Sequence, residues 1–530
     1  MADTPLSANR QIARASGIVM VGYVLSTVAG LAAQILITRA FGTTSELDSY
    51  YAANRVPEFL FALISGGALA SAFLPTFARF LTRGDREGGW ALASSIINIV
   101  IVALGLLSGL AALFAPGIVR LLAPGFSSAE QIQLTTSLLR VMLLSPLIFG
   151  VSGLLMATLN AHQHFVFPAL APASYRLGQI LGVLLLANRM GIFGLAWGTV
   201  IGAALHLLVQ LPVFLRLRPR LGFSLGLHLP AVHEVGRLLA PRLLGVAVVQ
   251  LNFIVNTIIA SGQPEGSLAA LTIAFTLMIM PQAVIAQAVA VASLPTFSAQ
   301  VARGEWDELR HSVGSALRGV LFLALPASIG LMMLRMPLVT LLLERGLFNA
   351  RSTDLVAWAL LWYAAGLVFH SLLEVVVRAF YAQYDTRTPV GVGVLAMSLN
   401  IALSLVLSRL FTDAGLPPHG GLALANSTAT ALETSALLFL LSRRMNGLGL
   451  RRLRRGLLAT AGGSIALALS LWAWMRLASG WPTWVQAGLG VLLGLAIYWG
   501  LSWMMGAPEA RQLPGMLFGR VRGSRPERVR

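Results

Sequence analysis

The chain has 530 residues, of which 57% are hydrophobic and only 11% are charged, whereas a soluble domain carries about 25% charged residues. Cysteine is absent, which excludes disulfides, thiolate catalysis and cysteine metal sites. The net charge of +18 comes from arginine, since the chain has no lysine, and the arginines cluster between apolar runs. This distribution is typical of a protein oriented in a membrane, not of a nucleic-acid-binding protein.

The apolar runs number about fourteen, and each is long enough for one membrane crossing, which needs about 20 residues. They predict an all-α polytopic membrane protein with about 14 transmembrane helices. In chain order we expect these helices at residues 15–41, 47–80, 90–114, 130–159, 167–187, 191–214, 235–261, 267–300, 311–334, 354–381, 388–409, 421–442, 456–478 and 483–505.

An internal repeat relates the two halves of the chain. Leu-Pro-Thr-Phe occurs at Leu74–Phe77 and again at Leu294–Phe297, and Arg-Gly at residues 83–84 returns at residues 303–304. With one more residue of shift two prolines also match, Pro116 with Pro337 and Pro168 with Pro389. Duplicated helical bundles are common among secondary transporters.

The repeat predicts four parts of the chain. Two six-helix lobes are expected over residues 1–220 and 221–450. Two further transmembrane helices are expected within residues 451–510, and a basic cytoplasmic tail over residues 511–530.

Arginine is unevenly distributed between the connections. Those after even-numbered helices carry the main clusters: Arg79, Arg83 and Arg86; Arg216, Arg218 and Arg220; Arg303 and Arg310; and Arg443, Arg444, Arg451, Arg452, Arg454 and Arg455. Because positive charge accumulates on the cytoplasmic side, both termini are predicted to lie in the cytoplasm.

No enzyme motif is present. A phosphate-binding Gly-x-x-x-x-Gly-Lys-[Ser/Thr] loop is excluded because there is no lysine. His162 and His164 flank one residue, which is a poor metal site without further ligands. The sequence therefore predicts a protein that is not an enzyme, with no cofactor, no metal and no nucleic-acid partner.

Five segments carry a resemblance to a known family. Residues 241–261 combine a Gly-anchored apolar run with a Gln and an Asn before a small-residue end. Four shorter segments agree with it: Arg39–Gly42, Asp48–Pro57, Ala72–Pro75 and Ala123–Phe126. Together they resemble the MurJ (MviN) family of proposed lipid II flippases, in the MOP exporter superfamily, in register over roughly residues 10–450.

This resemblance implies two six-helix lobes around a central cavity that opens alternately to each side of the bacterial cytoplasmic (inner) membrane. It also implies the substrate, an undecaprenyl-diphosphate-linked cell-wall precursor such as lipid II. The family moves this lipid from the inner to the outer leaflet for peptidoglycan synthesis. A diphosphate cannot cross hydrocarbon unaided, so the cavity must replace its water with arginine donors.

Three helices depart from the family's pattern. The first helix of the family carries two arginines, and Thr27 and Ala33 stand at these positions. The second helix has Phe61 and Ala62 where the family offers an arginine. Within the eighth helix, residues 275–281 lack the charges of the family's Asp-Arg-x-x-x-[Glu/Gln]-x-Pro pattern.

The charges that remain are the candidates for substrate binding, because an ionisable group at the bilayer centre costs about 2.5–3.5 kcal/mol. Arg39, Asp48 and Arg55 match family positions near the outer ends of the first two helices; a local ion pair at this corner is the alternative. Arg176 and Arg242 are the preferred substitutes for the missing arginines, with snorkelling to an interface as the alternative.

Four further residues are candidates for energy coupling. Glu374 and Glu433 are the deepest acidic residues, although Glu374 is spaced to pair with Arg378 on its own helix. Asn256 and Asn400 match positions where polar residues recur in the family, and hydrogen bonding between helices is their alternative role. The expected partners are a lipid-linked glycan, membrane lipids, and a coupling cation or the membrane potential.

The sequence therefore favours a flippase for a lipid-linked cell-wall precursor. Two alternatives remain open at this point. One is an ion-coupled exporter of small amphipathic molecules, like the multidrug branch of the same superfamily. The other is a non-transporting paralogue that scaffolds envelope-synthesis enzymes, because the family's cavity arginines are missing.

Overall fold

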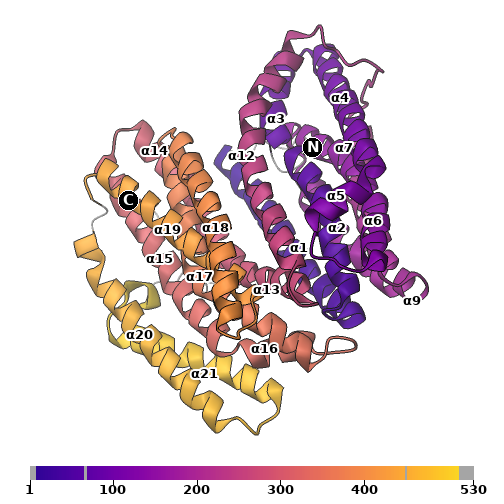
Figure 1. Ribbon diagram of the computed structural model, residues 1–530. Coiled ribbons are helices and arrows are strands. Elements are labelled where there is room, and N and C mark those ends of the chain that lie inside the picture. Colours follow the sequence, from indigo (N-terminus) through magenta and orange to yellow (C-terminus); the bar gives the residue numbers. More distant parts are fainter. Residues whose placement is uncertain (1–7, 65–67, 448–449, 512–530) are drawn as a thin grey trace, which may run out of the picture. The chain divides into compact units, whose positions relative to one another are not determined.

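The computed structural model describes residues 8–64, 68–447 and 450–511 (Figure 1). Within these ranges the regular structure is helical, as predicted, with no strand. All but the first residue of the predicted basic tail lies outside the described residues.

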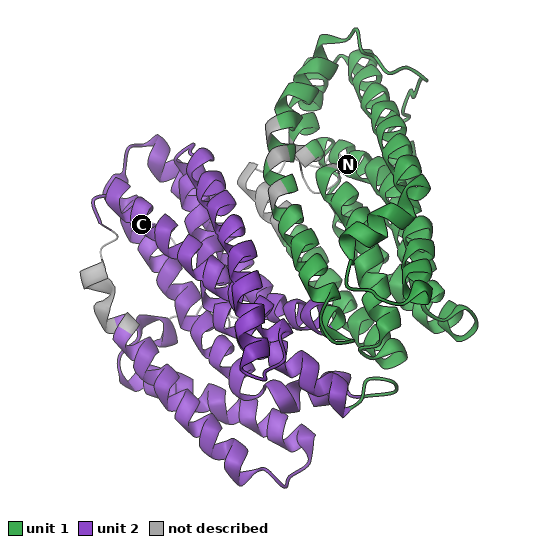
Figure 2. Cartoon of the chain, viewed as in Figure 1, with its two compact units in different colours: residues 1–269, 345–349 green, residues 270–344, 350–530 purple. Residues whose placement is uncertain are grey.

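Contacts along the chain divide it into two compact units, which Figure 2 shows in different colours. Unit 1 comprises residues 1–269 and 345–349, and unit 2 comprises residues 270–344 and 350–530. The units are defined by contacts between residues, whereas the lobes were predicted from a repeat in the sequence. The lobe boundary predicted near residue 220 therefore stays a prediction.

Unit 1 contains the helices α1 (Ala8–Phe41), α2 (Ser45–Ile64), α3 (Ala68–Thr82), α4 (Arg86–Leu113), α5 (Ala115–Leu122), α6 (Ala129–Met142), α7 (Leu144–Ala161), α8 (Val166–Leu181), the π-helix η1 (Gly182–Leu186), α9 (Ala187–Met190), α10 (Ile192–Leu208), α11 (Leu211–Arg216) and α12 (Pro230–Ser261). Helix α13 (Ser267–Gln282) begins in unit 1 and ends in unit 2.

Unit 2 continues with the π-helix η2 (Ala283–Gln287), α14 (Ala288–Ala302), α15 (Trp306–Met333), α16 (Arg335–Leu343), α17 (Ala350–Ala382), α18 (Arg387–Asp413), α19 (His419–Arg444), α20 (Leu450–Leu477) and α21 (Thr483–Met504).

Thirteen helical segments of the described ranges are long and apolar enough to cross a membrane. The predicted run over residues 47–80 is the further candidate. It contains α2, which carries four charged residues, and α3, which has 15 residues; residues 65–67 between them lie outside the described residues. The count thus agrees with the predicted arrangement of about 14 helices.

The repeat is visible in local structure. Helices α4 and α15 both have 28 residues, and each follows a glycine with a left-handed backbone, Gly84 (φ 72°) and Gly304 (φ 71°). The residue after each glycine closes the same hydrogen bond across the turn, Asp85 N to Phe80 O (3.0 Å) and Glu305 N to Gln300 O (2.9 Å). The repeat inferred from the sequence is therefore confirmed at these turns.

Helices α8 and α10 approach closely because glycine recurs on both. Gly178 and Gly182 lie four residues apart, and so do Gly198 and Gly202 on α10. A Cβ atom on Gly178 would lie 2.2 Å from the Cα of Gly202, and one on Gly182 would lie 2.4 Å from the Cα of Gly198. Small residues at this spacing let transmembrane helices pack backbone to backbone.

In unit 2 the hairpin of α20 and α21 packs on α15. The hydroxyl of Tyr498 donates to the carbonyl of Phe322 at 2.6 Å, and both side chains are buried. An ion pair between Arg318 and Glu509 joins the end of this hairpin to α15. The two C-terminal helices are thus attached to unit 2 by apolar and polar contacts.

Gly178→Ala should destabilise the protein by about 1–3 kcal/mol, because the new methyl group meets backbone atoms that cannot move aside. The measurement is the thermal unfolding midpoint of the purified protein in detergent. Gly109→Ala on α4 is the matched control, because nothing lies within 4 Å of its added Cβ, and its midpoint should stay the same or rise. Equal midpoints for the two variants would contradict the close packing of α8 and α10.

Candidate functional site

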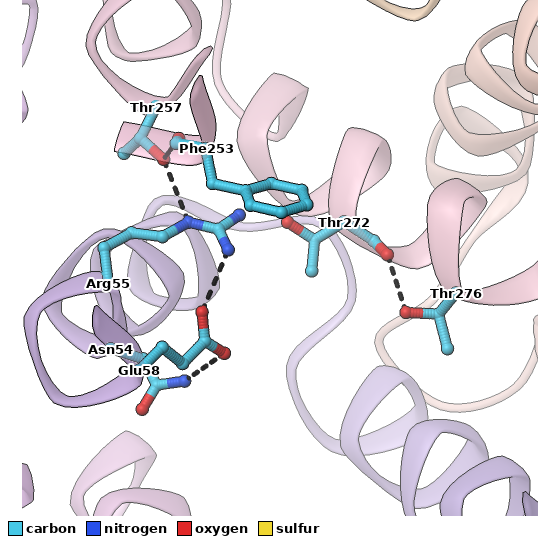
Figure 3. Close-up of polar contacts among 7 residues, drawn as sticks. All are labelled: Asn54, Arg55, Glu58, Phe253, Thr257, Thr272 and Thr276. Atoms are coloured by element: carbon cyan, nitrogen blue, oxygen red, sulfur yellow. Dashed lines mark hydrogen bonds and ion pairs between the residues drawn. The ribbon is translucent and has the colours of Figure 1, made fainter. Parts of the chain in front are cut away.

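A charged cluster lies on α2 in unit 1 (Figure 3). Arg55 pairs with Glu58 one turn further along, at 3.0 Å, and Asn54 donates to the second carboxylate oxygen of Glu58 at 2.7 Å. The Nε of Arg55 donates to the hydroxyl of Thr257 on α12 at 3.0 Å, and the guanidinium lies 5.7 Å from the ring centre of Phe253. Arg55 therefore forms its ion pair within α2, with Glu58 as the partner, and the ion pair considered for the corner of the first two helices stays a prediction.

Figure 3 also shows part of α13, where the hydroxyl of Thr276 donates to the carbonyl of Thr272 at 2.8 Å. This bond lies within one helix. Helix α13 carries no charged residue over its whole length, in agreement with the loss of charge noted in the sequence.

A second arginine lies in the same electrostatic environment. The hydroxyl of Tyr51 on α2 accepts a hydrogen bond from Gln34 of α1 at 3.3 Å. It also lies within electrostatic range of Arg55, Glu58 and Arg176. We call these five residues the polar cluster; it brings together side chains of α1, α2 and α8.

Arg176 makes two contacts within its own helix, α8. The guanidinium of Arg176 donates to Gln179 at 3.0 Å and lies 5.5 Å from the ring centre of Tyr175. Gln179 in turn donates to the hydroxyl of Tyr175 at 3.3 Å. Arg176 is exposed whereas Gln179 is buried, so the guanidinium keeps donors available for a ligand.

Packing of α1 on α8 sets the position of Arg176. A Cβ atom on Gly22 would lie 2.4 Å from the carbonyl oxygen of Ala169, and one on Gly30 would lie 3.6 Å from the Nε of Arg176. The later residue of α1 contacts the later residue of α8, so the two helices run parallel. The contact at Gly22 is too close for a side chain, whereas at Gly30 an added Cβ would be in ordinary van der Waals contact with the arginine.

This contact bears directly on the missing family charges. Gly30 lies between Thr27 and Ala33, the two positions at which the family's first helix carries arginine. The hydroxyl of Thr27 donates to a backbone carbonyl of its own helix, and Ala33 is buried. The guanidinium of Arg176 on α8 therefore lies beside the part of α1 where the family's arginines are missing.

Asp48 is placed differently from the arginines. Its two carboxylate oxygens accept the backbone N–H groups of Gly266 and Ala269, each at 2.7 Å, at the start of α13. Negative charge at a helix N-terminus satisfies donors that have no partner within the helix. This contact gives Asp48 a structural role; substrate binding by Asp48 stays a prediction.

Arg39 lies close by at the end of α1 and its side chain is exposed. Its carbonyl oxygen accepts the N–H of Leu347 at 3.0 Å. A cavity of about 560 Å³ at this corner is lined in part by Glu46 and Glu265. Glu265 accepts the backbone N–H of Ser45 at 2.8 Å, so one of the two carboxylates holds the start of α2.

Arg242 is exposed on α12, and its part in substrate binding stays a prediction. Among the described residues no group of three or more His, Asp or Glu side chains could hold a metal ion.

In unit 2 the main charged pair lies on α17. Glu374 and Arg378 form the ion pair that their spacing predicts. Gln282, the last residue of α13, and Gln287, the last residue of the π-helix η2, both donate to Glu374, at 3.4 and 3.2 Å. The pair thus joins α17 to the connection between α13 and α14.

The other coupling candidates are polar residues on three helices. Glu433 of α19 is buried, and its Oε1 lies 3.3 Å from a Cβ built on Gly393 of α18. Asn400 of α18 is buried and accepts a hydrogen bond from Ser404 at 3.2 Å. Asn256 is half-buried on α12. Their role in coupling stays a prediction.

Sequence reasoning missed Gln34, Tyr51 and Glu58. Glu58 carries a local signal, because it follows Pro57 directly and is spaced three residues from Arg55 on one helix face. Gln34 and Tyr51 carry none, since their contact joins separate helices.

A sequence model of the family described as "Lipid II flippase MurJ" matches residues 37–489. The chain belongs to this family. The protein of this name from Burkholderia cenocepacia is 29% identical over 501 residues, which cover 91% of this chain and 95% of that protein. A probable lipid II flippase MurJ from Rhizobium tropici is 30% identical over 522 residues, covering 94% and 95%.

Solved structures agree with this membership at the level of the fold. A lipid II flippase MurJ in an inward closed conformation has a TM-score of 0.76 at 23% identity and covers 95% of this chain and 99% of its own. A multidrug resistance MATE family transporter of the MOP superfamily, in an inward-facing conformation, has a TM-score of 0.66 at 16% identity, with coverages of 80% and 95%. The family and the many apolar helices make the chain a multi-pass protein of the bacterial inner membrane.

Asp48→Asn should lower the thermal unfolding midpoint, because an amide offers one acceptor oxygen where two backbone N–H groups need partners. The expected cost is about 1.5–3 kcal/mol for hydrogen bonds to a charged acceptor. Glu46→Gln is the matched control, since Glu46 lies exposed in the same helical turn, and it should change the midpoint little. An unchanged midpoint for Asp48→Asn would show that Asp48 does not hold the start of α13.

Proposed function

We propose that this chain is a flippase for lipid II, the lipid that its relatives' names give as their substrate. In this proposal it moves the diphosphate-linked head group from the inner to the outer leaflet by alternating access. The polyprenyl tail stays in the bilayer while the head group passes through the protein. The observation that carries the proposal is the position of Arg176 beside Gly30, between the two neutral positions of α1.

The chemistry of the substrate explains why this position matters. A diphosphate leaves water only if hydrogen-bond donors and positive charge replace its hydration. A guanidinium supplies five N–H donors and remains charged in any protein environment. One of the donors of Arg176 is used by Gln179, at 3.0 Å, so the others are free to bind phosphate oxygens.

Arg55 has a smaller role in this proposal. Glu58 neutralises its charge and Thr257 binds its Nε, so fewer of its donors remain for a ligand. Arg39, Asp48 and Arg242 complete the set of proposed substrate-binding residues at lower priority, because each lies outside the polar cluster.

Energy coupling is also part of the proposal. Glu374 contacts Arg378 and two glutamines, and the loss of its charge would weaken the ion pair at the centre of this group. Glu433 is the second proposed coupling residue because its carboxylate is buried on α19. Asn256 and Asn400 are the proposed uncharged participants, and the driving force is a coupling cation or the membrane potential.

The proposed arrangement in the membrane follows the arginine distribution. Both termini face the cytoplasm, with lobes over residues 1–220 and 221–450. No step of this transport cycle forms or breaks a covalent bond, so the proposal assigns no enzymatic activity.

The two alternatives receive less support. The ion-coupled exporter of small amphipathic molecules rests on a structural likeness of 16% identity to MATE transporters. The non-transporting scaffold rests on an emptied cavity, yet Arg176 places a charge beside the neutral stretch of α1.

Expression of the chain in bacteria depleted of their own lipid II flippase should restore growth. Arg176→Ala should reduce rescue about tenfold or more, because a charge-assisted hydrogen bond contributes about 1.5–3 kcal/mol. Arg176→Lys should rescue in part, since it keeps the charge and loses the planar fork. The measurement is colony formation at equal membrane levels of each variant.

Arg189→Ala is the matched control, because Arg189 is an exposed arginine further along the same helical run. It should rescue like the unmodified chain. Full rescue by Arg176→Ala would reject the role of this residue, and failure of the unmodified chain at normal levels would reject lipid II as the substrate.

A further inference from the structure

The connection between α11 and α12 alternates in sequence. From Leu221 to Leu227 the odd positions are Leu, Phe, Leu and Leu, and the even positions are Gly, Ser and Gly. This segment, residues 221–227, is called the apolar strip below; it is irregular and turns at Gly226, whose backbone is left-handed (φ 53°).

Hydrogen bonds hold the backbone of the apolar strip against α4. Ser94 donates to the carbonyl of Gly222 at 2.6 Å and accepts its N–H at 2.8 Å. Asn98 donates to the carbonyls of Gly222 and Ser224, at 2.8 and 2.9 Å. A Cβ atom on Gly226 would lie 2.1 Å from the hydroxyl of Ser95, so a side chain there would not fit.

The four large side chains of the apolar strip, called its apolar face below, are exposed. The side chains of Leu221, Phe223, Leu225 and Leu227 are 53%, 103%, 39% and 61% exposed. Backbone bonds to α4 hold these side chains in fixed positions while leaving them uncovered. Apolar side chains that are exposed and held in fixed positions are typical of a surface that binds an apolar partner.

Basic residues directly precede the apolar strip. Arg216 and Arg218 are exposed and form no ion pair within the described part of the chain. Arg220 pairs with Glu87 of α4 at 2.9 Å. Two guanidinium groups therefore remain available beside the apolar face.

The place of the apolar strip along α4 identifies the partner. Helix α4 has 28 residues, a length of about 42 Å, and the hydrocarbon core is about 30 Å thick. Its charged residues, Arg86 and Glu87, are its first two, so the excess length lies at this end. Ser94 and Asn98, which hold the strip, then lie where the hydrocarbon core begins.

We propose that the apolar strip is a membrane-surface element. Leu221, Phe223, Leu225 and Leu227 insert among the lipids beside α4, and Arg216 and Arg218 bind the phosphates of anionic lipid headgroups. With the orientation proposed above, this is the inner leaflet. A membrane is favoured over a protein partner because the strip continues the lipid-facing surface of a transmembrane helix and carries unpaired arginine next to apolar side chains.

The absence of cysteine allows a direct test by spin labelling. A nitroxide on Phe223→Cys, in protein reconstituted into vesicles, is exposed to oxygen, which partitions into lipid, and to a nickel chelate, which stays in water. Collision with oxygen should exceed collision with nickel several-fold. Arg83→Cys, in the exposed turn before α4, is the aqueous control and should show the reverse.

The results distinguish lipid, water and protein as the surroundings of the apolar strip. A label at residue 223 that meets nickel as readily as the label at residue 83 would show that the strip lies in water and would overturn the proposal. A label that meets neither reagent would show protein covering the strip and would also overturn it. Both results are independent of lipid II transport.

The arginines are tested by lipid composition. In vesicles that contain phosphatidylglycerol, the oxygen-to-nickel ratio at residue 223 should be at least twofold higher than in phosphatidylcholine alone. Arg216→Gln with Arg218→Gln should remove this difference. An equal ratio in the two lipids, or a difference that survives both substitutions, would reject anionic headgroups as the ligand.

Discussion

A guanidinium inside a membrane protein needs partners that offset the loss of water, and the surroundings of Arg176 are built around this requirement. Gln179 accepts one of its N–H groups and the ring of Tyr175 faces its charge. A carboxylate, Glu58, and a second arginine, Arg55, lie in the same electrostatic environment. These contacts stabilise the charge while leaving donors free, which is the state a phosphate-binding arginine requires.

The packing of helices in unit 1 also fixes the position of Arg176. Glycines on α8 and α10 let the two backbones touch, and a Cβ on Gly202 would lie 2.4 Å from the carbonyl of Tyr175, the residue before Arg176. On its other side α8 meets α1 closely at Gly22, where an added Cβ would lie 2.4 Å from the carbonyl oxygen of Ala169. Helix α8 is thus fixed between two close contacts, so the arginine it carries has a defined place beside α1.

Much of the architecture could be predicted from the sequence because its determinants are local. Runs of apolar residues specify the spans, and Arg-Gly after a helix specifies the turns that repeat at residues 84 and 304. Residues 47–80 were predicted as one span, but the four charged residues of α2 keep this helix out of the group of apolar spans. Glu374 and Arg378 were predicted as a pair since both lie on one helix.

The candidate site was predicted less completely because its contacts join distant parts of the chain. Asp48 binds the start of α13 more than 200 residues away, and no spacing rule connects them. Glu58, Gln34 and Tyr51 were missed for the same reason, apart from the local spacing of Glu58. Arg176 was expected as a substitute for the lost arginines, but only the packing of α1 on α8 places it beside Gly30.

The most direct test moves the charge back to α1. Lipid II translocation is measured in liposomes with the purified chain, with Arg176→Ala, and with Arg176→Ala combined with Thr27→Arg. If a guanidinium beside this stretch of α1 holds the diphosphate, the single variant loses translocation and the double variant recovers it. Loss in both variants, with normal folding, would show that the position of Arg176 on α8 matters for another reason, and normal translocation by Arg176→Ala would contradict the account.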